Sequence, residues 1–162
     1  MQEADTRAGQ VAGRPGDAQR LQGIGGWLIL MGIGQVLGPL QILSGMISEY
    51  GSLPDGMFAR IPAAFVGDAA LRLGFVGFLV YTAFLFFNKR AAFPRMFIIS
   101  YIVGLVLPFA VAAWVSATSG VSTMGNLATS DFLWTYLPGA AVGAVWVSYV
   151  LNSKRVANTF VE

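Results

Sequence analysis

The chain has 162 residues, of which 56% are hydrophobic and only 11% are charged, and its mean hydropathy is +0.65. A soluble domain carries about twice that share of charged residues, so this composition indicates a fold whose outside is covered by lipid. The sequence contains no cysteine and no histidine, which excludes disulfides, thiolate nucleophiles, zinc-type metal sites and imidazole acid–base catalysis.

The N-terminal part of the chain changes from polar to apolar within a few residues. Residues 1–22 mix arginines with carboxylates among Gly, Ala and Gln, which predicts a disordered cytoplasmic tail. The stretch that follows, "GIGGWLILMGIGQVLGPL" (23–40), is rich in glycine. A dinucleotide-binding loop needs G-x-G-x-x-G directly after a strand, whereas here a polar tail comes first and the glycines have the wrong spacing. We therefore expect a membrane span whose glycines serve helix packing.

Four apolar runs are each about as long as a bilayer-spanning helix, near 20 residues. They predict an all-α integral membrane four-helix bundle over 23–152, followed by a short cytoplasmic C-terminal tail over 153–162. The expected loop between the first two spans contains Pro54-Asp55-Gly56, a sequence typical of a turn. The predicted spans cover about 25–47, 68–87, 95–117 and 131–151.

The positions of lysine and arginine predict the orientation of the spans, because these residues are enriched in cytoplasmic loops. The N-terminal tail, the loop between the second and third spans and the C-terminus hold most of them, whereas the other two loops hold only Arg60. Both termini are therefore expected in the cytoplasm (N-in/C-in). The basic residues form no continuous stripe interleaved with aromatic residues, so the net charge of +2 does not predict a nucleic-acid partner.

Small residues are spaced for close helix packing in every predicted span, and two pairs of glycines stand out. Gly34 and Gly38 are one turn apart in the first span, and Gly139 and Gly143 are one turn apart in the fourth. Two glycines at this spacing allow another helix to approach closely. We expect both pairs to form helix contacts.

Three stretches carry a resemblance to a known family: "LQGIGGWLIL" (21–30), "NKRAAFPRMFI" (88–98) and "SKRVANTFV" (153–161). They resemble the start, the middle loop and the end of the bacterial membrane-protein family known as domain of unknown function 2569. The resemblance covers residues 21–161. It implies a small multi-pass protein with four spans in the bacterial inner (cytoplasmic) membrane, and it supplies no catalytic or binding residues.

Few ionisable or polar residues lie within the spans, and four of them are candidates for a polar cavity. Asp68 and Arg72 are four residues apart on one helical face near the outer end of the second span. They form either a structural ion pair or a site where Arg72 binds an anionic headgroup or substrate. Gln41 is expected to hydrogen-bond across helices, and Asp131 is expected to cap the fourth helix.

The sequence does not provide a nucleophile and base for catalysis, so we expect no enzyme activity and no cofactor or metal. The first functional hypothesis is an accessory or scaffold protein that binds another membrane component through its small-residue faces. The alternative is a small transporter or lipid-binding protein with a polar cavity near the outer leaflet. Expected partners are the bilayer and either another membrane protein or an anionic lipid. Pro108 and Pro138 are expected to kink the third and fourth spans, and the sequence leaves open whether these kinks move.

Overall fold

The computed structural model describes residues 25–120, 123, 125, 127 and 130–161, together with their side chains except those of 130, 131 and 135. Every regular element in this part of the chain is a helix, which confirms the predicted all-α class. The predicted tail over 1–22 lies outside the described residues. The helices are α3 (Trp27–Gly51), α4 (Met57–Arg60), α5 (Pro62–Phe87), α6 (Phe93–Ser119), α7 (Ser130–Asn152) and α8 (Lys154–Thr159).

Three of these helices, α3, α5 and α6, are long and apolar enough to cross a membrane, with 25, 26 and 27 residues. Many of their large apolar side chains are exposed, among them Ile33, Val36 and Leu37. Such exposure is expected where the solvent is lipid. The helix α7 has 23 residues and lies where the fourth span was predicted. It is less apolar than the other three because Trp134, Tyr136 and Pro138 interrupt its aliphatic residues.

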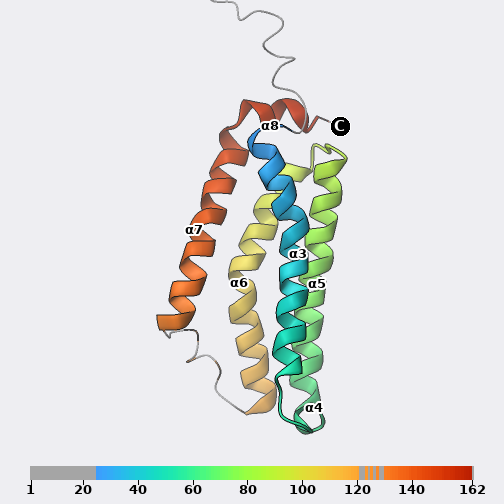
Figure 1. Cartoon of the computed structure of the whole chain (residues 1–162), viewed down its shortest axis with the longest axis vertical. Helices are drawn as coiled ribbons and strands as arrows, with labels where there is room; N and C mark the ends of the chain where they lie inside the picture. The colour runs from blue at the N-terminus through green and yellow to red at the C-terminus, as the bar shows by residue number, and fades with distance from the viewer. Residues whose placement is uncertain (1–24, 121–122, 124, 126, 128–129, 162) are drawn as a thin grey trace, which may run out of the picture.

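The helix α5 packs against both α3 and α6, and α6 also contacts α7. The helix α8 lies across one end, where α3 begins and α5 ends, and α4 lies at the opposite end (Figure 1). We call these the α8 end and the α4 end.

The glycine pair of the first span does not form the contact that was predicted within this chain. A Cβ atom added at Gly34 or Gly38 would meet no atom within 4 Å. The reason is that α3 buries another face, which includes Leu28, Met31 and Gly32 in helical steps of three and four. The expectation of a close intramolecular approach at Gly34 and Gly38 is therefore wrong for the described residues.

At two other glycines, the nearest neighbour is an aromatic ring rather than the backbone of another helix. The Trp114 ring of α6 lies so close to Gly67 of α5 that an added Cβ would overlap it, and Tyr101 of α6 lies in the same way against Gly143 of α7. The Trp114 indole N–H also donates to the carbonyl of Ala63 (3.0 Å).

The other glycine of the predicted fourth-span pair behaves differently, because a Cβ at Gly139 would meet nothing within 4 Å. Two tyrosine hydroxyls link α6 to α7 instead. Tyr101 donates to the carbonyl of Ala140 (2.7 Å), and Tyr136 donates to the carbonyl of Leu105 (2.5 Å). The contact between α6 and α7 therefore includes one glycine of the pair, Gly143, together with these two hydrogen bonds.

The predicted loop over 48–67 is much shorter in the structure. The helix α3 continues to Gly51, and α5 begins at Pro62, where proline is tolerated because a first-turn N–H has no helical partner. The predicted turn is present, and Gly56 has the positive φ of 79° that suits glycine there. As a result, Asp68 lies well inside α5 rather than at its start.

The C-terminal segment is not a free tail. Ser153 caps α8 by accepting a hydrogen bond from the Val156 N–H (3.4 Å). Val156 and Phe160 are buried in an apolar core cluster together with Phe86 and Phe93. This cluster closes the α8 end of the bundle.

Candidate ligand cavity

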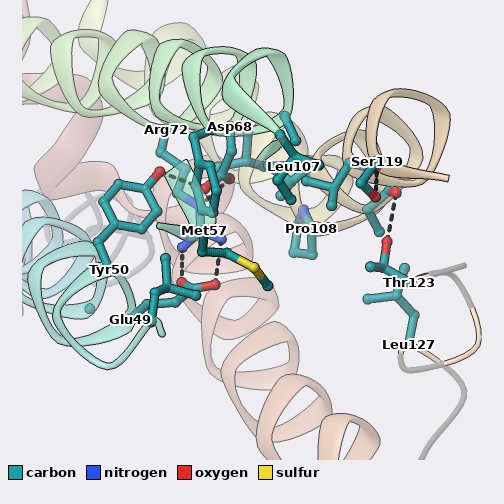
Figure 2. A pocket seen from close by; sticks show the side chains of 18 of the residues that line it. Glu49, Tyr50, Met57, Asp68, Arg72, Leu107, Pro108, Ser119, Thr123 and Leu127 are labelled. Carbon is teal, nitrogen blue, oxygen red and sulfur yellow. Dashed lines mark hydrogen bonds and ion pairs between the residues drawn. The ribbon is translucent and has the colours of Figure 1, made fainter. Parts of the chain in front are cut away.

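A cavity of about 680 Å³ lies at the α4 end of the bundle. Its walls come from the last turns of α3, from α4, from the first turns of α5 and from the second half of α6, and Thr123 and Leu127 beyond α6 also line it (Figure 2). Most of the lining is apolar, including Ile42, Leu53, Phe65, Leu107, Val111 and Val115.

Hydrogen bonds hold Thr123, beyond the end of α6, beside the cavity. The Thr123 hydroxyl donates to the carbonyl of Ala112 (2.8 Å), and the Thr123 N–H donates to the Ser116 hydroxyl (3.0 Å). The cavity also borders Pro108, which has no N–H to donate within α6. Thr123, Leu127 and the second half of α6 together form the wall opposite the last turns of α3 (Figure 2).

One corner of the cavity is charged, because a carboxylate lies on each side of a single guanidinium (Figure 2). Arg72 donates from Nε to Oδ1 of Asp68 (2.6 Å). Its Nη1 lies 2.5 Å from Oε2 of Glu49, and its Nη2 lies 3.3 Å from Oε1 of the same residue. The ion pair predicted between Asp68 and Arg72 is therefore one half of a three-residue cluster.

The members of this ion cluster differ in exposure. The side chain of Asp68 is only 6% exposed, that of Arg72 is 22% exposed and that of Glu49 is 54% exposed. The second carboxylate oxygen of Asp68 accepts from the hydroxyl of Tyr50 (2.6 Å). Asp68 is thus enclosed by its two donors, whereas Glu49 is the member that faces the surroundings.

The formal charge of the cluster follows from its members. Two carboxylates, Glu49 and Asp68, surround one guanidinium, so the ionised cluster has a net charge of −1. No three of the His, Cys, Asp and Glu side chains in the described part of the chain come together as a metal ion would require. We therefore consider the cluster as a polar end for an organic ligand.

Aromatic rings border the charged corner. Tyr50 and Phe65 both line the cavity, and their ring centroids are 6.0 Å apart in an edge-to-face arrangement. Phe58 of α4 packs against both rings. The corner thus combines carboxylates with the faces and edges of aromatic rings.

The structure brings together only some of the residues that the sequence suggested. Asp68 and Arg72 line the cavity, whereas Gln41 is exposed on α3 outside the lining. For Asp131 the structure gives only the backbone, which lies in the first turn of α7, and its predicted capping contact falls outside the described side chains. The sequence analysis missed Glu49 and Tyr50.

Glu49 was missed because the first span was expected to end before it. The sequence nonetheless contains a useful indication: Glu49 is the only carboxylate between Trp27 and Pro54, and it lies at the same end of the bundle as Arg72. An unpaired guanidinium in an apolar helix is costly, so a second carboxylate at that depth is an expected partner.

The sequence was compared with known proteins. A family model described as "Protein of unknown function (DUF2569)" matches residues 21–161. Neither the curated proteins nor the solved structures gave a match to the chain.

Proposed function

Because the chain belongs to the DUF2569 family, whose description assigns no activity, we propose a function from its own cavity: the protein binds a lipid-like amphiphile within the membrane. This proposal selects the lipid-binding alternative from the sequence analysis. The observation that carries it is a cavity of about 680 Å³ with an apolar body and one charged corner. Small-molecule sites fall in the range of about 300–1,000 Å³ and are mostly apolar, with a few polar groups that fix orientation.

The surroundings of the cavity support an amphiphile rather than a water-soluble metabolite. Three of the helices, α3, α5 and α6, are long and apolar enough to span a membrane, and all three contribute to the cavity walls. A ligand that enters between such helices comes from lipid and needs an apolar body. The ion cluster of Glu49, Asp68 and Arg72 would then hold its polar end.

The test fills the cavity without changing the ion cluster. Val111→Phe places a larger side chain into the space that Val111 lines, whereas Val80→Phe makes the same change at an exposed position of α5 that does not line it. After purification in mild detergent, native mass spectrometry should show copurified lipid-like molecules on the unaltered protein and on the Val80→Phe variant. The Val111→Phe variant should lose most of these bound molecules.

Two results would contradict the proposal. One is a Val111→Phe variant that is folded and keeps the same bound molecules as the Val80→Phe variant. The other is a native protein from which no amphiphile copurifies and to which none binds when it is added.

We further propose that the protein is a four-span protein of a bacterial inner membrane with both termini in the cytoplasm. Family membership and the length and apolar character of three helices support a membrane location. The basic residues support the orientation, because those of the described chain gather at the α8 end, where cytoplasmic lysine and arginine are expected. They are Lys89, Arg90, Arg95, Lys154 and Arg155, whereas Arg60 and the ion-paired Arg72 lie toward the opposite end.

Cysteine labelling tests this orientation directly, since the chain has no cysteine of its own. Single cysteines at Ser52 and Gly125 should react with an impermeant thiol reagent added to intact cells. Single cysteines at Ala91 and Asn158 should react only after the cells are opened. Labelling of the second pair alone in intact cells would invert the orientation, and labelling of only one member of a pair would contradict four spans.

A second candidate function is a scaffold that binds another membrane component, and one observation favours it. The side chain of Gln41 is exposed on α3 beside the open glycines Gly34 and Gly38, and an amide that faces lipid lacks the partner it would gain at a helix contact. A photo-crosslinking residue at Gln41 should then yield one defined protein adduct in native membranes, with Val36 as the control. Equal diffuse labelling from both positions would argue against the scaffold.

A further inference from the structure

The charges at the cavity corner select between kinds of polar headgroup. We propose that the ligand of this cavity has a positively charged ammonium group attached to an apolar body, and that Glu49 binds the ammonium group. This inference rests on the proposed function, because it names the chemical class of the amphiphile that the cavity takes.

The first step concerns Arg72, the residue that an anionic headgroup would require. All three of its guanidinium nitrogens already face carboxylate oxygens: Nε faces Asp68, and both Nη atoms face Glu49. Two of the five guanidinium N–H groups remain, but an incoming phosphate or sulfate would meet a cluster with a net charge of −1. Like charges at short distance repel, so the structure disfavours an anion here.

The second step concerns Glu49, the residue that a cation would contact. Its side chain is 54% exposed, although its carboxylate takes part in the ion pair with Arg72. Each carboxylate oxygen has two lone-pair positions, and Arg72 fills one on each oxygen. The carboxylate thus keeps accepting capacity for a second positive group on its exposed side.

The third step concerns the aromatic rings at the same corner. Tyr50 and Phe65 line the cavity beside Glu49. A ligand cation placed over an aromatic face gains about 0.5–2 kcal/mol, depending on how far it is desolvated. The carboxylate therefore matches an ammonium group in charge, and the two rings offer it aromatic surface. The apolar wall formed by α6 matches a hydrocarbon chain.

An ammonium group on an apolar body has two sources in a membrane. It occurs in the headgroup of phosphatidylethanolamine, and it occurs in free lipophilic amines and quaternary ammonium compounds. Both sources present the same ammonium group, so the experiment has two arms. One arm tests whether the cavity prefers a positive charge, and the other tests which source supplies the ligand.

The charge arm compares probes that have the same chain but different headgroups. Decyltrimethylammonium, decanol and decyl sulfate are titrated into the full-length protein in dodecyl maltoside micelles, which carry no ammonium group. Decyltrimethylammonium should bind at least about tenfold more tightly than decanol, which corresponds to about 1.4 kcal/mol, and decyl sulfate should bind most weakly. Val111→Phe should weaken the binding of every probe that occupies the cavity.

Glu49→Gln tests the residue that the inference assigns. This change should lower the affinity for decyltrimethylammonium by about tenfold and leave that for decanol unchanged. Asp55→Asn removes the same charge from an exposed position at the same end of the bundle that does not line the cavity, and it should leave both affinities unchanged. Equal losses in the two variants would reduce the effect to general electrostatics and overturn the inference.

The remaining outcomes separate this inference from the proposed function. If the three probes bind equally and Val111→Phe weakens them all, the cavity binds amphiphiles but the ammonium preference is wrong. If no probe binds above the level of empty micelles, both proposals fail. If decyltrimethylammonium binds as expected, added phosphatidylethanolamine either competes with it, which identifies the lipid as the source, or does not compete, which identifies a free amine.

Discussion

Removal of Arg72 tests how the buried carboxylate of Asp68 is stabilised. The side chain of Asp68 is 6% exposed and has two donors, the Arg72 guanidinium and the Tyr50 hydroxyl, each at 2.6 Å. Breaking a buried pair by removing one partner costs about 3–5 kcal/mol. The Tyr50 hydrogen bond survives in Arg72→Gln, and the pair between Arg72 and the half-exposed Glu49 contributes at most about 1 kcal/mol. We therefore expect Arg72→Gln to lower the free energy of unfolding by about 2–4 kcal/mol.

The assay is equilibrium unfolding of the variants in mixed micelles of dodecyl maltoside and sodium dodecyl sulfate. The double variant Asp68→Asn/Arg72→Gln removes both charges and should recover most of the loss, because no buried carboxylate then lacks its partner. Glu49→Gln should cost at most about 1 kcal/mol, and Arg60→Gln, at an exposed position of α4, should cost almost nothing. The reasoning is refuted if Arg72→Gln is no more destabilising than Glu49→Gln, or if the double variant is as unstable as the single one.

Two further predictions concern packing. Gly67→Leu should destabilise the bundle by about 1–3 kcal/mol in the same unfolding assay, because the Trp114 ring occupies the space that the new side chain needs. The control Gly34→Leu meets open space and should leave the free energy of unfolding nearly unchanged. Equal effects of the two changes would mean that the ring does not rest on Gly67. Phe160→Ala should lower the free energy of unfolding by about 3–5 kcal/mol, because Phe160 lies in the buried cluster under α8. Val161→Ala, at an exposed position, should change it little. A Phe160→Ala variant as stable as the unaltered protein would mean that the C-terminal segment does not pack against the bundle.

The positions of the long apolar helices could be predicted in part, because their signals are local. The apolar run of α5 ends at Phe87 both in the prediction and in the structure, since Asn88, Lys89 and Arg90 cannot continue it at low cost in lipid. By contrast, the helix α8 was missed because it has only six residues and begins with two basic ones. Its place depends on burial of Val156 and Phe160 against residues far away in the sequence, which no local pattern reveals.

The glycines show another limit of sequence analysis. A pair of glycines one turn apart permits close approach, but it does not determine which face of a helix is buried. In α3 the structure buries the face with Leu28 and Gly32 and leaves Gly34 and Gly38 open. At Gly67 the neighbour is a tryptophan ring from α6, a contact that requires knowledge of the helix pairing.

The ion cluster was half predictable. The spacing of Asp68 and Arg72 indicates a pair on one helical face, and the structure contains that pair. The partner Glu49 is on another helix, 23 residues earlier, and its role depends on α3 continuing to Gly51. That extension is decisive for the chemistry, because it changes the corner from a neutral pair to a cluster with a net charge of −1.

The most direct test of an amphiphile in this cavity is to map where one binds. A decylammonium probe with a photoreactive diazirine at the far end of its chain is bound to the full-length protein, irradiated and located by peptide mass spectrometry. We predict adducts on the apolar lining, above all between Leu107 and Val115 of α6, and their loss in the Val111→Phe variant. Adducts spread evenly over exposed positions such as Val36 and Val80, unchanged by Val111→Phe, would contradict the account.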